Sequence, residues 1–174
     1  MAKAHDHKTN ALRELDAAGL PHEALFFEAE ATMTGEEIAR AQGEDPDAVF
    51  KTLVTQGKSG THYVFLVPVT GELDLKKAAS AAGEKAISMI KARELLPLTG
   101  YVHGGCSPIG MKKRFATFVD ETAQLFDTIY FSGGKVGCQV RMSPDDLQKL
   151  IPFEYVDLTV PEQPRHGCSG ISLP

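Results

Sequence analysis

Lys51 is a candidate functional residue of this 174-residue sequence because of its residue type and its position in a predicted strand. It lies in the run Val49-Phe50-Lys51-Thr52-Leu53-Val54, which is typical of a β-strand, so strand alternation places Lys51 on one face with Val49 and Leu53. An ammonium group there can offer three hydrogen-bond donors and a full charge to a phosphate. The alternative is a structural lysine whose stem covers apolar surface while its charge reaches water. The strand pattern alone leaves both interpretations open.

The segment His103-Gly104-Gly105-Cys106-Ser107-Pro108-Ile109-Gly110 is a second candidate, because it is rich in glycine and contains a proline. Glycines leave backbone N–H groups accessible and allow close approach of a ligand, so the loop could hold a phosphate or an oxyanion. The motif is neither a P-loop nor a dinucleotide fingerprint, and a tight turn is the alternative. Lys112, Lys113 and Arg114 follow directly, either as a basic site or as a solvated charged face.

A third candidate is Ser132-Gly133-Gly134-Lys135, which is similar to an anion-binding nest of backbone N–H groups. A plain hairpin turn explains the same residues equally well. Gln139 lies two residues beyond Gly137 on the following predicted strand, where it could face the same cleft.

Cys106 and His103 could form a cysteine nucleophile with its histidine base, although no residue in the sequence is placed to orient the histidine. Cys138 is predicted to be a small core residue, and Cys168 lies near the C-terminus. His5 and His7 near the N-terminus are expected to be solvent-exposed, with weak metal binding as the alternative. The sequence has no HExxH motif and no Cys/His cluster, so we expect neither a metal nor another cofactor.

The elements that position these residues follow from periodicity and capping signals. Helices are predicted over residues 9–18, from a capping box at Thr34-Gly-Glu-Glu37 through Ala41, over 75–82, over 91–96 where Pro97 is expected to end the helix, and from Ser143-Pro144 onward. Strands are predicted over residues 23–28, 49–55, 62–69, 114–119, 128–132, 137–141 and, at an edge, 153–158. Strands and helices do not alternate regularly, and several neighbouring strands form hairpins. We therefore expect a mixed α/β fold with a largely antiparallel mixed sheet surrounded by helices.

Composition excludes several classes of protein. The sequence is 43% hydrophobic and 24% charged, as expected for a globular protein, and we predict one domain over residues 1–160 followed by a flexible tail over 161–174. The apolar run at 63–69 is far shorter than the roughly 18 residues of a membrane span, and the N-terminus is too polar for a signal peptide, so we expect no membrane association and a cytoplasmic location. A formal net charge of −5 argues against nonspecific binding of DNA, so contact with RNA would need a local patch or a partner.

Four motifs in order resemble the YbaK/EbsC family, over a stretch from about Ala11 to about Leu158. The motifs are Phe50-Lys51-Thr52-Leu53, residues 71–77, residues 100–110 with Lys112-Lys113, and residues 129–135. The resemblance implies a trans-editing aminoacyl-tRNA deacylase related to the editing insertion of bacterial prolyl-tRNA synthetases. It also implies a mixed α/β fold around a barrel-like sheet. Cys-tRNA(Pro) is the substrate typical of the YbaK branch, and the implied partners are a mischarged tRNA and prolyl-tRNA synthetase.

The resemblance also implies roles for individual residues. Lys51 matches the family's essential lysine, which would hold the phosphate or ribose of the terminal adenosine, while Gly104 and Gly105 belong to a loop whose backbone N–H groups could stabilise an oxyanion. In the YbaK branch the thiol of the substrate attacks its own ester carbonyl and releases a cyclic thioester, so the protein mainly positions the reactants. The remaining expected substrate-binding residues are Thr34, Phe50, Thr52, His103, Ser107, Pro108, Ser132, Gly133 and Gln139.

The sequence departs from the family pattern at the expected pocket wall. Met33 and Thr34 stand where some relatives carry an aromatic residue, a tyrosine of the preceding strand is matched loosely by Leu25, Phe26 or Phe27, and Gln139 stands where some members have an aspartate. Cys-tRNA(Pro) is therefore the first expectation, with Ala-, Ser- or Pro-linked tRNA as alternatives. The sequence also leaves open a noncatalytic module that binds an amino acid or a tRNA end, and a cysteine hydrolase that uses Cys106.

Overall fold

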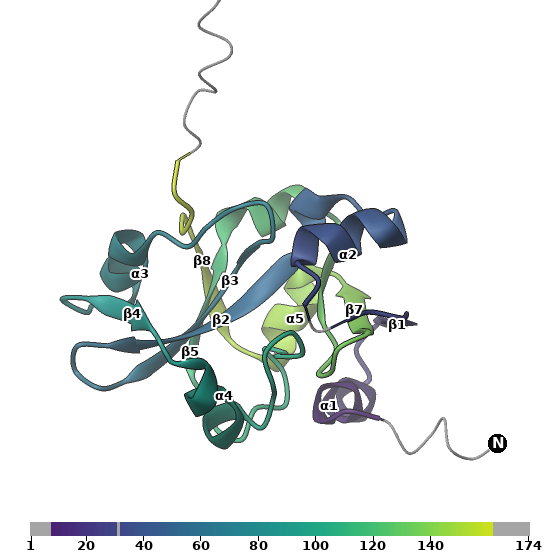
Figure 1. The fold of residues 1–174 in the computed structure, drawn as a ribbon, viewed down its shortest axis with the longest axis horizontal. Coiled ribbons are helices and arrows are strands. Elements are labelled where there is room, and N and C mark those ends of the chain that lie inside the picture. Colours follow the sequence, from purple (N-terminus) through teal and green to yellow (C-terminus); the bar gives the residue numbers. More distant parts are fainter. Residues whose placement is uncertain (1–7, 31, 162–174) are drawn as a thin grey trace, which may run out of the picture.

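The computed structural model describes residues 8–30 and 32–161. His5, His7, Cys168 and the expected tail beyond residue 161 lie outside the described residues. Within them the chain is a mixed α/β fold, as predicted (Figure 1).

The strands form two sheets. The larger sheet has the order β4-β2-β3-β5-β8, and the smaller has the order β1-β7-β6. The strand bounds are β1 Glu23–Phe26, β2 Phe50–Gly57, β3 His62–Pro68, β4 Ile87–Met89, β5 Ala116–Asp120, β6 Ile129–Ser132, β7 Cys138–Met142 and β8 Phe153–Val156. In Figure 1 strand β4 marks one end of the larger sheet, and strands β1 and β7 of the smaller sheet lie on the opposite side of the molecule.

Pairing within the sheets is largely antiparallel, which confirms that part of the expectation. Strands β2 and β3 form the predicted hairpin, with Lys51 opposite Val67, and β6 and β7 form a second hairpin across the Gly133-Gly134-Lys135 turn. Strands β3, β5 and β8 instead pair in parallel, with β8 at the predicted edge.

The expected barrel-like sheet is not confirmed. The described strands make two open sheets that are joined by a single parallel bridge between Val49 and Tyr130, and no closed barrel is formed from them. This bridge matters for the site, because it brings the start of β2 beside β6.

Helices surround the sheets and most begin at the predicted caps. The helix bounds are α1 Asn10–Ala18, α2 Gly35–Gln42, α3 Leu75–Ala82, α4 Ala92–Thr99 and α5 Pro144–Leu150, with short 3-10 turns η2 Pro46–Ala48 and η3 Glu121–Leu125. The predicted capping box is present at α2, where Thr34 and Glu37 exchange hydrogen bonds.

The expected end of α4 at Leu96 was wrong. The helix continues through Pro97 to Thr99, and Lys91 is its N-cap rather than its first residue. Two bonds stabilise the extra turn, since the Thr99 hydroxyl donates to the Leu95 carbonyl at 2.7 Å and the Gly100 N–H donates to the Leu96 carbonyl at 2.8 Å. Gly100 then ends the helix in the left-handed conformation, with φ of 86°.

The main hydrophobic core fills the space between the two sheets and α1. It includes Leu12 and Leu15 of α1, as the helical periodicity predicted, together with Phe50 and Phe131 from the two sheets. A second cluster packs α3 against the larger sheet through Phe65 and its stacked partner Phe118. No helix among the described residues is long and apolar enough to cross a membrane.

Candidate active site

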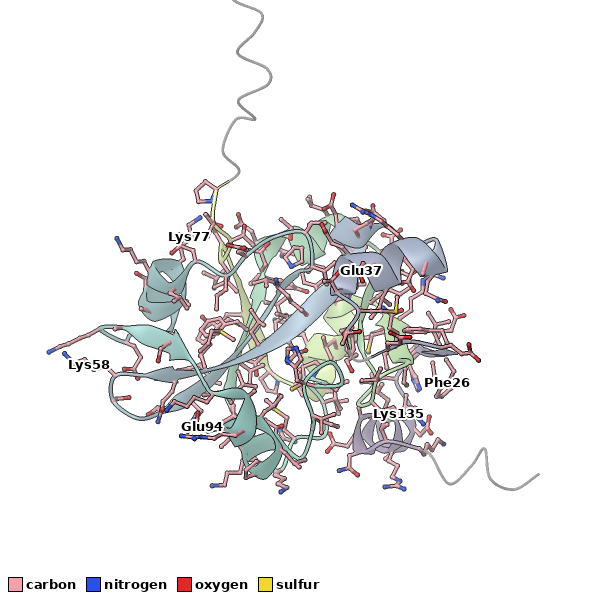
Figure 2. The ribbon with its side chains drawn as sticks, viewed as in Figure 1. Phe26, Glu37, Lys58, Lys77, Glu94 and Lys135 are labelled. Carbon is pink, nitrogen blue, oxygen red and sulfur yellow. The ribbon has the colours of Figure 1, made fainter. Side chains whose placement is uncertain are left out.

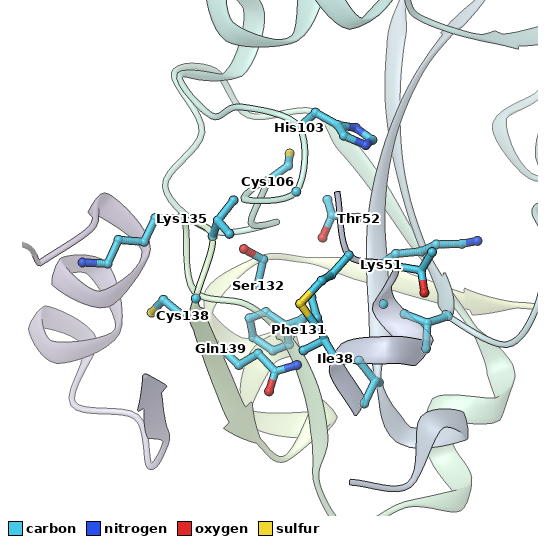
Figure 3. A pocket seen from close by; sticks show the side chains of 18 of the residues that line it. Ile38, Lys51, Thr52, His103, Cys106, Phe131, Ser132, Lys135, Cys138 and Gln139 are labelled. Atoms are coloured by element: carbon cyan, nitrogen blue, oxygen red, sulfur yellow. The ribbon is translucent and has the colours of Figure 1, made fainter. Parts of the chain in front are cut away.

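One pocket of about 270 Å³ collects most of the predicted site residues (Figure 3). Its walls come from the starts of α2 and β2, the β6–β7 hairpin and the glycine-rich loop after α4. Eight predicted residues line it, namely Thr34, Phe50, Lys51, Thr52, His103, Gly104, Ser132 and Gln139.

The strand register explains why residues so far apart in sequence meet at this pocket. The Val49–Tyr130 bridge is parallel, so Lys51 and Ser132, each two residues further on, lie at the same level of their strands. Ser132 is in turn paired with Gln139 across the β6–β7 hairpin. Lys51, Ser132 and Gln139 therefore stand on three successive strands at one height.

Lys51 is half-buried on β2, and its side chain makes no ion pair or hydrogen bond within residues 8–30 and 32–161. In Figure 3 its side chain extends away from Ser132 and Gln139. A cationic group that lines a pocket without a carboxylate partner is free to bind an anion, and the role of Lys51 in binding the substrate stays a prediction.

The N-terminus of α2 forms a second wall. Thr34 accepts a hydrogen bond from the Glu37 N–H at 3.1 Å, and a Cβ on Gly35 would lie 2.4 Å from a methyl carbon of Val69, so only glycine allows this approach. Met33, just before this turn, also lines the pocket. Leu25, Phe26 and Phe27 of the preceding segment were the candidates for the pocket wall. Of these, Phe27 lines the pocket, while Phe26 is 62% exposed.

The glycine-rich loop contributes His103, Gly104 and Cys106 to the pocket. Gly105 and Ser107 of the same loop do not line it and pack against neighbouring residues instead. Gly105 packs on the next hairpin, because a Cβ there would lie 2.8 Å from the Cα of Lys135. Ser107 is fully buried and accepts a hydrogen bond from the Ile109 N–H at 3.3 Å.

Gly105, Ser107, Pro108 and Gly133 are therefore absent from the pocket lining that the structure describes, and their expected contacts with substrate stay predictions. Gly133 lies beneath the hairpin turn, where its N–H donates to the Cys138 carbonyl at 2.8 Å.

Both cysteines of the pocket wall are held in the neutral form. Burial raises the pKa of the Cys106 thiol to about 12, although a hydrogen bond with Thr99 opposes the shift. Burial also raises the pKa of Cys138, against the opposing charge of Lys135. A neutral thiol is a poor nucleophile, so the geometry does not favour the Cys106–His103 pair. Cys138 is 2% exposed in the main core, as predicted.

Two buried oxygens of the pocket residues have no hydrogen-bond partner in the described chain. They are the Thr52 hydroxyl oxygen and the Gln139 amide oxygen, and Gln139 is only 6% exposed. The Gln139 amide interacts with the carboxylate of Glu44, just after α2, and this interaction opposes the burial that raises the Glu44 pKa. Buried acceptors of this kind normally have a donor, which a bound substrate could supply.

The sequence did not reveal several lining residues. Phe131 and Ile38 have the same apolar pattern as ordinary core residues, so nothing in the sequence assigns them to a pocket. Glu44 gives no signal either, because its proximity to Gln139 depends on how the end of α2 packs against β7.

A second hollow of about 550 Å³ lies elsewhere and is lined in part by Asp47, Glu72 and Asp120. It contains none of the predicted site residues, and the Asp120 carboxylate is already satisfied by the N–H groups of Thr122 and Leu158. The described residues include no group of three or more His, Cys, Asp or Glu side chains that could hold a metal ion.

Comparison with known proteins identifies the class of protein to which this fold and pocket belong. The model of the aminoacyl-tRNA editing domain family matches residues 29–150, which includes the lysine strand, the glycine-rich loop and the β6–β7 hairpin. The chain belongs to this family.

One curated relative and two solved structures are similar to most of this chain. The chain is 38% identical over 161 residues, 92% of its length and 98% of the relative's, to EbsC of Enterococcus faecalis (strain ATCC 700802 / V583), which is named as a candidate Cys-tRNA(Pro)/Cys-tRNA(Cys) deacylase. It is similar to the crystal structure of a candidate trans-editing enzyme for prolyl-tRNA synthetase, with 28% identity, a TM-score of 0.76, and coverage of 87% of this chain and 96% of that one. The hypothetical protein APE2540 shares the fold at 24% identity, with a TM-score of 0.78 and coverage of 87% and 99%.

Proposed function

We propose that this chain is a trans-acting editing deacylase that removes the amino acid from mischarged tRNA, with Cys-tRNA(Pro) as its substrate. The observation that carries the proposal is the unpaired Lys51 at one height with Ser132 and Gln139 in a pocket fit for a small aminoacyl group. The name of the EbsC relative supports the choice of amino acid and tRNA.

Lys51 and the loop have complementary roles in this proposal. The Lys51 ammonium binds the phosphate or ribose of the terminal adenosine, and Thr52 lies beside it on β2. Backbone N–H groups near Gly104 stabilise the negative charge that develops on the ester carbonyl oxygen. His103, at the exposed edge of the same loop, contacts the adenosine end.

The substrate supplies the nucleophile. Its thiolate attacks the ester carbonyl carbon, a C–S bond forms, and the C–O bond to the ribose breaks. The ribose oxygen takes up a proton, and the amino acid leaves as a cyclic thioester that water hydrolyses. The neutral state of Cys106 and Cys138 supports this assignment, because neither thiol is prepared to attack at neutral pH.

The net charge of the protein restricts how it can bind tRNA. Because the net charge is −5, affinity for the tRNA body is supplied by a local basic patch together with prolyl-tRNA synthetase, in the cytoplasm. The expected contact with the synthetase would appear as faster deacylation when the synthetase is added.

The test is to incubate the protein with Cys-, Ala-, Ser- and Pro-linked tRNA(Pro) and to follow ester loss for the wild type and Lys51→Ala. We expect Cys-tRNA(Pro) to be hydrolysed fastest, and Lys51→Ala to lose about 100-fold in kcat/KM, as for loss of one partner of a hydrogen-bonded charge pair with the substrate. Lys58→Ala is the matched control, since Lys58 projects from the β2–β3 hairpin tip far from the pocket (Figure 2).

Two results would contradict the proposal. If no aminoacyl-tRNA loses its ester, the chain is not a deacylase, and tight binding without turnover would indicate the noncatalytic module. If Ala-tRNA is the fastest substrate instead, editing stands and the cyclisation step fails, because alanine has no thiol.

A further inference from the structure

Gln139 holds an acceptor in the pocket that the described chain does not satisfy. The residue sits on the central strand of the smaller sheet, between Leu25 and Ser132, and is more than nine-tenths buried. Among residues 8–30 and 32–161 its amide oxygen has no hydrogen-bond partner. An unsatisfied buried oxygen destabilises the folded state unless a ligand donates to it.

Glu44 gives the Gln139 side of the pocket a negative charge. The chain places it firmly, because Gly43 ends α2 in the left-handed conformation and the Glu44 N–H donates to the Ala39 carbonyl at 2.8 Å. The carboxylate is half-buried, interacts with the Gln139 side chain and has one oxygen, Oε1, that is buried without a partner.

The interaction also sets the direction of the Gln139 amide. A carboxylate only accepts hydrogen bonds, so the NH₂ group of Gln139 is the end that interacts with Glu44 and its oxygen is left for the pocket. A donor bonded to a charged acceptor becomes more polarised, which makes that oxygen a stronger acceptor.

We infer that Gln139 accepts a hydrogen bond from the α-ammonium group of the aminoacyl moiety, and that Glu44 is a positioning residue that orients Gln139 and supplies the complementary charge. This inference rests on the proposed function and names the group that the pocket recognises. The α-ammonium is the cationic donor common to aminoacyl esters, and a cationic N–H group forms a stronger hydrogen bond to an unsatisfied amide oxygen than a neutral donor does. The thiol of cysteine is a much weaker donor.

The experiment measures binding, so that it does not depend on turnover. The probe is 3′-alanylamino-3′-deoxyadenosine, in which an amide replaces the labile ester, and its N-acetylated form, which lacks the positive charge. Dissociation constants are measured by calorimetry for both probes and compared as a ratio. We expect the wild type to bind the free amine about tenfold more tightly, as for hydrogen bonds to a charged group.

Variants then test which residues recognise the ammonium group. Gln139→Leu removes the acceptor, and Glu44→Gln removes the charge at nearly unchanged size; each is expected to bring the ratio of dissociation constants down to about threefold or less. Glu36→Gln is the matched control on α2, since within the described residues Glu36, unlike Glu44, makes no hydrogen bond with Gln139, and it is expected to keep the wild-type ratio. Glu30→Gln tests the rival carboxylate, which lines the pocket but is exposed to water.

The results distinguish the ammonium-binding inference from the proposed deacylase function. A ratio near one in the wild type, no binding of either probe, or a ratio that falls in Glu30→Gln but not in Glu44→Gln would overturn the inference. If the tRNA panel shows no ester loss while the binding ratio behaves as expected, the proposed function fails and the ammonium site remains. Circular dichroism of each variant identifies a loss of fold, and the more conservative Glu44→Asp keeps the charge should Glu44→Gln unfold.

Discussion

Cys106 shows how the surroundings of a residue decide whether it can do chemistry. The side chain is 8% exposed and lies in the pocket wall, yet burial raises its pKa to about 12, so almost none of it is thiolate at neutral pH. We predict that Cys106→Ala keeps deacylation of Cys-tRNA(Pro) within about threefold of wild type, in line with a substitution that removes no reacting group.

The same variant should lose stability, because deleting a buried sulfur leaves a small cavity that costs about 1 kcal/mol. Single-turnover deacylation and urea unfolding measure the two effects separately. Complete loss of activity in a folded Cys106→Ala protein would mean that the cysteine is the nucleophile after all.

Sequence motifs were sufficient for some residues of the pocket and insufficient for others. Lys51 and Gly104 could be placed because their motifs, together with two others in the same order, resemble one family, and both line the pocket. Glu44 could not, since its contact with Gln139 joins two segments with no shared motif. The roles of Ser107 and Pro108 remain predictions, because both lie outside the pocket lining.

At the scale of elements, α2 is held in place by its capping box as well as by packing. Thr34 accepts from the Glu37 N–H at 3.1 Å while Glu37 accepts from the Thr34 N–H at 3.3 Å. We predict that Thr34→Ala lowers the free energy of unfolding by about 1 kcal/mol, because the first turn loses its cap. It should also weaken binding of the aminoacyl-adenosine probe, since this turn forms a pocket wall.

Ser143→Ala is the matched control for this prediction. Ser143 caps α5 in the same way, by accepting from the Asp145 N–H at 3.2 Å, but it does not line the pocket. Urea unfolding should therefore show a similar loss for both variants, with calorimetry showing weaker probe binding only in Thr34→Ala. If the two variants bind the probe equally well, the Thr34 cap stabilises α2 but does not affect the pocket.

The local signals predicted most elements but not how the strands join. Caps and periodicity located the helices and both hairpins, because these depend on neighbouring residues. The parallel pairing of β3 with β5, and of β5 with β8, depends on long-range packing that no local pattern encodes. Pro97 misled the prediction of α4 for a related reason: the bonds made by Thr99 and Gly100 after it stabilise a turn that proline alone would disfavour.

At the scale of the whole molecule, an acidic protein has to bind an acidic substrate. The net charge is −5, and the most concentrated run of exposed cations is Lys112, Lys113 and Arg114, directly after the loop that lines the pocket. Lys112 already packs over Gly100 and approaches the Pro97 carbonyl at 3.5 Å, which leaves Lys113 and Arg114 to meet phosphates of the tRNA acceptor end.

We predict that a Lys113→Ala/Arg114→Ala double variant has a higher KM for Cys-tRNA(Pro) while its affinity for the 3′-alanylamino-3′-deoxyadenosine probe stays unchanged. The reason is that the probe lacks the neighbouring phosphates that these cations would neutralise. For every phosphate that is no longer neutralised, the slope of log affinity against log salt should become shallower by roughly 0.7 to 0.9. Filter binding of tRNA over a salt series measures this slope.

The matched control for the double variant is Lys58→Ala/Lys85→Ala, which removes the same charge from two residues outside the pocket lining. Lys58 lies at the β2–β3 hairpin tip, and its N–H donates to the carbonyl of Ala86, the neighbour of Lys85, at 2.9 Å. If both double variants weaken tRNA binding equally, only the overall charge matters and the tRNA has no fixed docking site on this face. If only the loop variant does so, the acceptor end approaches along residues 112–114, in line with the glycine-rich loop over the ester and Lys51 at the adenosine.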